Sequence, residues 1–161
     1  MLWRPIKRVQ DEQDGVVLIE ALLVIPILTI LTFGILEFGN MMWQRQQLQV
    51  GVRDAARYWS RCRDTINSEV TACNETVARN IAFYGNPDGT GNLRVPGWGP
   101  AIAGSSLSLD PAKGAFEGTP GPEDIVRVVG AFNYIGSPVY NTILEGVITV
   151  SWETEMRHIG W

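Results

Sequence analysis

The sequence is poor in the residues that most catalytic and metal sites need. It has one histidine, His158, and two cysteines, Cys62 and Cys73. The cysteines are eleven residues apart, which fits neither a C-x-x-C redox pair nor the ligand spacing of a zinc site. His158 has no nucleophile motif near it and is expected to be a lone exposed side chain. No acid–base pair of carboxylates is evident, so the sequence predicts no enzyme, no catalytic residue, no metal and no cofactor.

The chain also lacks a concentration of positive charge. It has 13 Lys and Arg against 17 Asp and Glu, a net charge of −4. Because nucleic-acid binding requires a basic surface, no nucleic-acid partner is expected. The Gly89-Thr90-Gly91 turn neither follows a strand nor opens a helix, so it is not a phosphate loop. No small-molecule substrate is expected either.

One long hydrophobic run stands out. From Val16 to Leu36 the chain is apolar apart from Glu20, Thr29 and Thr32. A helix of this length extends roughly 31 Å, which matches the hydrocarbon core of a bilayer. The run therefore predicts a membrane-spanning helix, preceded by a leader, residues 1–15, that shows no helical period and is expected to be flexible.

Glu20 is unusual in such a span. An ionised carboxylate deep in a bilayer costs about 2.5–3.5 kcal/mol, and no Lys or Arg lies between Val9 and Gln44 to pair with it. The carboxylate could reach the headgroup region by snorkelling. Alternatively its partner is made later, because cleavage after Gly15 gives Val16 a free amine and makes Glu20 the fifth residue of the mature chain.

Two stretches carry a resemblance to a known family. They are VLIEALLVIP, residues Val17–Pro26, and GILEFGNMMWQRQQLQVGVRDAARY, residues Gly34–Tyr58. Both resemble the TadE-like minor pilins of the tight-adherence (Flp) pilus system, which pair a Glu-centred span with a GIxExG exit and an A-R-x-x-A-R helix. Ala21 follows Glu20, where the major Flp pilin tends to carry Tyr, so the minor, pseudopilin class fits better.

This resemblance, which covers about the first 60 residues, implies a function. A prepilin peptidase would cut after Gly15 on the cytoplasmic side, and Glu20 would pair with the Val16 amine to set the register between subunits. The partners would be the bacterial inner membrane, other minor pilins and the major Flp pilin. The N-terminus would be cytoplasmic and the C-terminal domain periplasmic, at the membrane or in the pilus. The alternative is an uncleaved single-pass scaffold or ligand-binding protein whose Glu20 contacts another membrane helix.

The predicted domains are the leader 1–15, the transmembrane helix 16–38 and an α+β head, 39–161, in a pilin-like architecture. The first helix should continue to about Cys62. Apolar residues recur at three- and four-residue steps on one face, namely Phe38, Met41, Met42, Leu48, Val52, Ala55, Ala56 and Trp59. Polar residues occupy the other face, namely Gln44, Gln47, Asp54, Arg57 and Arg61.

A second, antiparallel helix is expected from an Asn67 or Ser68 cap to Phe83 or Tyr84. Its apolar side would carry Val70, Cys73, Val77, Ile81 and Tyr84, and the Asn74-Glu75-Thr76 sequon would lie inside it. If it folds back on the first helix, Cys73 approaches Cys62. The two can then form a disulfide in an oxidising compartment, or remain free and partly buried thiols.

The rest of the chain should be loops and strands. Residues 85–122 contain nine Gly and six Pro, so only short strands are expected, at Leu93–Val95 and Leu107–Leu109. Asp124–Tyr134 and Val147–Arg157 predict an antiparallel pair laid on the long helix. A short helical piece at Tyr140–Leu144 would lie between them.

Overall fold

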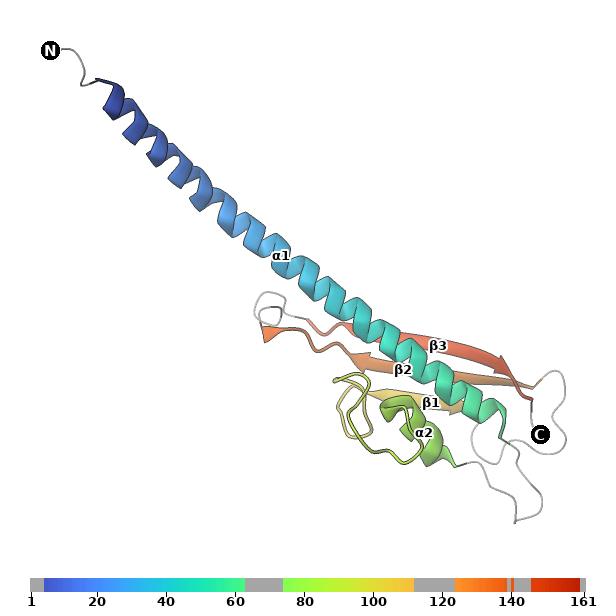
Figure 1. Cartoon of the computed structure of the whole chain (residues 1–161). Coiled ribbons are helices and arrows are strands. Elements are labelled where there is room, and N and C mark those ends of the chain that lie inside the picture. Colours follow the sequence, from blue (N-terminus) through green and yellow to red (C-terminus); the bar gives the residue numbers. More distant parts are fainter. Residues whose placement is uncertain (1–4, 63–73, 112–123, 139, 141–145, 160–161) are drawn as a thin grey trace, which may run out of the picture. The chain divides into compact units, whose positions relative to one another are not determined.

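The computed structural model describes residues 5–62, 74–111, 124–138, 140 and 146–159, with side chains from Gly15 onward (Figure 1). In chain order, the elements are α1 (Pro5–Ser60), α2 (Glu75–Tyr84), β1 (Ser106–Asp110), β2 (Ile125–Asn133) and β3 (Thr149–Arg157). The contacts divide the chain into two compact units, Met1–Gly39 and Asn40–Trp161. The second unit is called the head below. The α+β fold predicted from the sequence is confirmed.

The N-terminal unit is helical earlier than predicted. Helix α1 begins at Pro5 rather than after Gly15, so the expectation of a leader without helical structure was wrong. Proline suits the first helical position, because its fixed φ is helical and its missing N–H has no intrahelical partner there. The Lys, Arg, Gln and Glu residues that follow are good helix formers, and extending an existing helix needs no new nucleus.

In the head, α1 buries one stripe of side chains. Leu48, Val52, Ala55, Ala56 and Trp59 are buried as predicted. Gln44, predicted on the outer face, is only 2% exposed, whereas Met42 is exposed. The reason is a polar contact: the Gln44 amide donates to the carbonyl of Ile135 (3.3 Å) and to the Oδ1 of Asn40 (3.4 Å).

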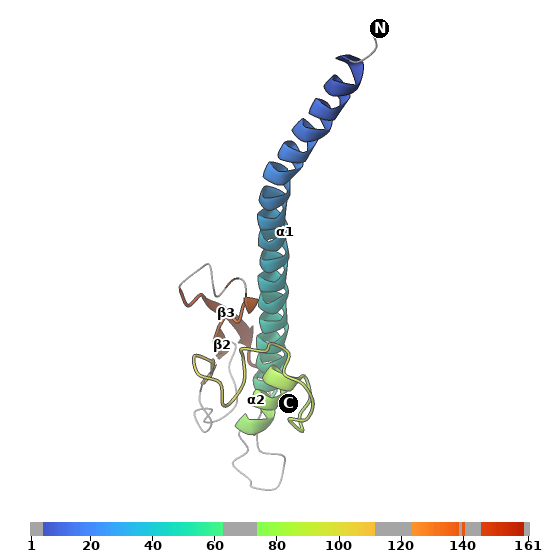
Figure 2. The ribbon, with the colours of Figure 1, turned by 90° about the vertical axis from the view of Figure 1, so that its left-hand side faces the viewer.

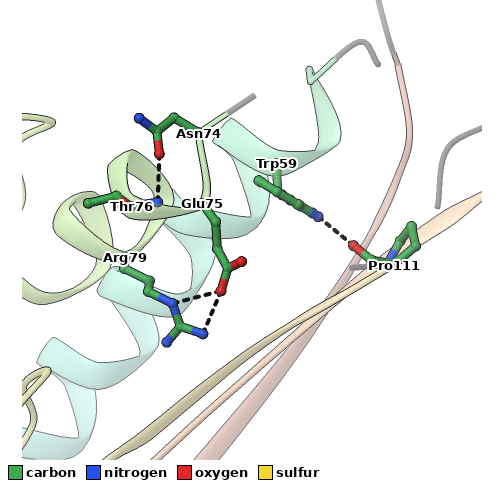
Figure 3. Close-up of polar contacts among 6 residues, drawn as sticks. All are labelled: Trp59, Asn74, Glu75, Thr76, Arg79 and Pro111. Carbon is green, nitrogen blue, oxygen red and sulfur yellow. Dashed lines mark hydrogen bonds and ion pairs between the residues drawn. The ribbon is translucent and has the colours of Figure 1, made fainter. Parts of the chain in front are cut away.

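Helix α2 starts later than predicted. Asn74 is extended and is the N-cap, accepting a hydrogen bond from the Thr76 amide, so the helix does not run through the sequon (Figure 3). The predicted caps Asn67 and Ser68 lie outside the described residues. The predicted face was also wrong, because Ala78, Ala82 and Phe83 are the buried residues. Two of these three residues are alanines because α2 approaches α1 closely: a Cβ added at Gly51 would lie 2.5 Å from the Ala82 carbonyl oxygen.

The sheet has three antiparallel strands in the order β1–β2–β3. Val126, Val128 and Phe132 alternate with outward residues and are fully buried on the side of α1 (Figures 1 and 2). A Cβ added at Gly130 would lie 2.7 Å from Val52 and 3.1 Å from Leu48, so β2 and α1 are in contact there. The predicted pair and the strand at Leu107–Leu109 are confirmed, while Val95 makes only an isolated bridge to Trp98. The helical piece predicted at Tyr140–Leu144 lies almost wholly outside the described residues.

The segment between α2 and β1 contributes a buried tryptophan to this core. Trp98 is fully buried, contacts the Phe83 ring edge-on at 4.9 Å and donates its indole N–H to the Ser106 carbonyl at 3.0 Å. Arg94 joins the same segment to α1 through a 2.7 Å ion pair with Asp54. A stretch that the composition marks as irregular is therefore well packed.

Candidate functional site

The residues of the predicted processing site lie together on α1. Gly15, Val16 and Glu20 are all helical and exposed. Val16 and Glu20 are four residues apart, so they lie one turn apart on the same side of the helix. Nothing beyond the neighbouring helical backbone lies within 4 Å of a Cβ added at Gly15, so no other described segment packs against this position.

The other polar groups in the span are satisfied by the helix itself. Thr29 donates its hydroxyl to the Ile25 carbonyl at 2.7 Å, and Thr32 donates to the Leu28 carbonyl at 2.8 Å. Glu20 differs, because within the described part of the chain it has neither a hydrogen bond nor an ion pair. The apolar residues around it are likewise exposed, with Val16, Leu22 and Leu23 each more than 60% exposed. Among the described residues of the span, Glu20 is therefore a carboxyl group without a polar partner on an apolar helical surface.

At the other end of α1, the structure corrects the prediction for His158. The side chain is 4% exposed rather than open to solvent, and its Nε2 lies 2.6 Å from the Cys62 carbonyl oxygen. The Ile159 amide donates to the Ser60 carbonyl at 2.8 Å, so the segment after β3 covers the end of the helix. The last carbonyls of a helix lack intrahelical partners, and the chain supplies them here.

Cys62 is buried and disulfide-bonded. Cys73, the other cysteine in the chain, lies outside the described residues, so the Cys62–Cys73 pairing stays a prediction. In the described ranges no three Cys, His, Asp or Glu side chains gather as metal ligands.

The described residues contain one helix that is long and apolar enough to cross a membrane, α1 from Gly15 onward, and its apolar window is fully exposed. Comparison with known families adds a second observation. Residues 15–57 match the family described as TadE-like protein. The matched segment begins at the predicted processing glycine and includes the span and Arg57 of the predicted A-R-x-x-A-R region.

The match confirms the predicted resemblance of residues 15–57 to the TadE-like family. It covers roughly a quarter of the chain and ends before α2 and the sheet. Searches of curated proteins and of solved structures found no match. The TadE-like segment therefore includes the candidate site residues Gly15, Val16 and Glu20. The match does not extend to the rest of the head.

Sequence reasoning missed two features of the head. Gln44 was assigned to the outer face by its polarity, and the only signal for its burial is its position between Met41 and Leu48 on the apolar stripe. The burial of Trp98 could have been suspected from its size and aromaticity in a segment otherwise rich in Gly and Pro.

Proposed function

We propose that this protein is a minor pilin-like subunit for assembly of a tight-adherence (Flp) pilus. A prepilin peptidase cuts it after Gly15, the span anchors it in the bacterial inner membrane, and the head lies in the periplasm or on the filament. The observation that carries the proposal is Glu20, a carboxyl group on an exposed apolar helix that has no polar partner in the described part of the chain. It lies within the TadE-like segment and one turn beyond the proposed new N-terminus.

The proposed cleavage creates a positive charge that can pair with Glu20. Before the cut, the nitrogen of Val16 is a neutral amide, and no cationic side chain lies within the span. After the cut it is an ammonium on the side of the helix where Glu20 lies, in the same chain or in a neighbouring subunit. Pairing then removes the cost of an isolated carboxylate in the bilayer.

The helical state of Gly15 bears on how the peptidase would act. A bond inside a helix must unwind locally before it can be cleaved, and glycine is among the residues that lower the cost of unwinding, by about 1 kcal/mol relative to alanine. Gly15→Ala therefore opposes cleavage by raising the cost of local unwinding.

The test is the N-terminal mass of the protein extracted from membranes of cells with an active prepilin peptidase. The expected mature chain starts at Val16, and Gly15→Ala abolishes the shortening. Gly39→Ala is the matched control, since it alters another open glycine of α1 and should leave cleavage intact. Glu20→Gln should be cut normally but assembled poorly.

An intact N-terminus in every sample would contradict the proposal and support an uncleaved single-pass scaffold. One observation favours that second candidate: α1 is helical from Pro5 through Gly15 without a break at the proposed site. The scaffold predicts that Gly15→Ala has no effect while Glu20→Gln still weakens association with other membrane helices.

A further inference from the structure

The head carries an exposed stripe along α1 on the side turned away from the sheet. Its residues are spaced by three and four positions, as one helical face requires, and all are exposed: Trp43, Gln46, Val50, Arg53 and Arg57. Arg61, directly after the helix, is also exposed. No acidic residue belongs to this stripe, and none of its arginines forms an ion pair within the described residues.

The opposite surface of the head is the outer face of the sheet, where the acidic side chains Asp110, Glu153 and Glu155 outnumber the basic side chains Arg127 and Arg157. Asp110, Arg127 and Glu155 are neighbours across the three strands, with Glu153 beside them. Arg127 is engaged by Glu153, with 2.8 Å between Nη2 and Oε2. Asp110 and Glu155 are exposed and have no salt bridge of their own among the described residues.

These two surfaces cannot meet within one molecule. The inner side of α1 packs on the inner side of the sheet through Val52 and Gly130, so the stripe and the outer sheet face point away from each other. Figure 2 shows β2 and β3 on one side of α1. A contact between the two surfaces therefore needs a second molecule.

The two surfaces also match along their length. Tyr134, just past β2, accepts a hydrogen bond from Asn40, while His158, just past β3, contacts Cys62. The acidic end of the sheet therefore lies level with the end of α1 that carries Arg57. The other end of the outer sheet face is uncharged, with Ala131, Asn133, Thr149 and Ser151, and lies level with the uncharged part of the stripe.

We propose that the α1 stripe of one copy of this chain binds the outer sheet face of a second copy in the same orientation. Arg53 and Arg57 would then face Glu153, Glu155 and Asp110, while Trp43 and Val50 would cover the uncharged end. The shared orientation rests on the proposed function, because copies anchored by the same span point the same way. In such a pair, one copy keeps its outer sheet face free and the other keeps its α1 stripe free. Further copies can bind there, so the contact builds an open row rather than a closed dimer.

The test is co-purification of two differently tagged full-length copies in neutral detergent. Wild-type copies should associate, and less so as salt rises, because exposed charges are screened. Arg57→Glu mixed with itself and Glu155→Arg mixed with itself each place like charges in contact, and association should fall by about tenfold or more. Arg57→Glu mixed with Glu155→Arg should restore it, because every contact then joins opposite charges.

Asp88→Arg is the matched control, because it makes the same charge change as Glu155→Arg at an exposed turn after α2 and belongs to neither surface. It should associate as the wild type does, and circular dichroism should show all variants folded. Monomeric wild type, or equal association in all variants and mixtures, would overturn the proposal, the latter by assigning association to the membrane helix. The N-terminal mass is independent of these results, so failure of the head contact is distinguishable from failure of the processing proposal.

Discussion

Gly51 of α1 lies against the backbone of Ala82 in α2: a Cβ added at Gly51 would be 2.5 Å from the Ala82 carbonyl oxygen and 2.7 Å from the Trp98 ring. The helices and the buried tryptophan meet at this point only because position 51 has no side chain. The close approach also explains why alanines, rather than the larger Val77 and Ile81, form the buried side of α2.

Gly51→Ala should therefore destabilise the head although alanine is the better helix former. Overpacking costs about 1–3 kcal/mol, which exceeds the gain of roughly 1 kcal/mol in helix propensity. Gly39→Ala, in the same helix but with nothing within 4 Å, should instead be neutral or stabilising. Thermal unfolding of the full chain in detergent, followed by circular dichroism, measures both. Equal midpoints for the two variants would contradict the close contact.

Trp59→Phe tests a buried hydrogen bond. Trp59 is 1% exposed, and its indole N–H donates to the Pro111 carbonyl at 2.9 Å (Figure 3). Removing the donor leaves a carbonyl without its partner and should cost about 1–3 kcal/mol in a denaturant titration. Trp43→Phe alters a half-exposed tryptophan of the same helix and should change stability by about 0.5 kcal/mol or less.

His158→Leu should loosen the junction between β3 and the end of α1. Leucine keeps the bulk but cannot donate to the Cys62 carbonyl, so a loss of about 1–3 kcal/mol is expected. Ile159→Ala is the control, because that side chain is 58% exposed and its hydrogen bond to Ser60 is made by the backbone. Amide hydrogen exchange at Ile159 should rise in the first variant only.

The ion pair between Arg127 and Glu153 predicts a pH effect. The hydrogen bond from the Arg127 side chain holds the pKa of the Glu153 carboxyl below its ordinary value of 4.5. The contribution of this carboxylate to folding is therefore complete above about pH 4.5 and is lost as the pH falls through the lower folded pKa. Glu153→Gln should flatten this acid part of the stability profile. Asp88→Asn, at an exposed acid without an ion pair in the described chain, should leave it unchanged.

The predicted Cys62–Cys73 disulfide can be tested by counting thiols. The unfolded, unreduced protein should contain no titratable thiol, and reduction should release two. Cys73→Ser should free one thiol and lower the free energy of unfolding by roughly 2–4 kcal/mol. Two free thiols without reductant would contradict the pairing. A wild-type molecule that is a disulfide-linked dimer would assign the bond to a partner chain.

The local pattern of the chain was enough to predict the span, the processing motif and the strands. Each depends on neighbouring residues: an apolar run for the span, Glu20 at a set distance from Gly15, and alternation in β2 and β3. The register of β2 and β3 also agrees with that alternation, since Val150, Trp152 and Met156 share one half-buried side.

Contacts between distant segments decided the remainder. Gln44 is buried because Ile135, far along the chain, supplies an acceptor, and His158 is buried because the end of α1 lies beside it. The Asn74 cap is the exception, because it is a local hydrogen bond to the Thr76 amide that the apolar periodicity alone did not predict. By itself, the sequence determined the TadE-like resemblance and the long apolar helix, because both depend on the spacing of residues that are close in the chain. Only the tertiary structure decided which polar groups are enclosed and which charged faces are exposed, because burial depends on what packs against a residue.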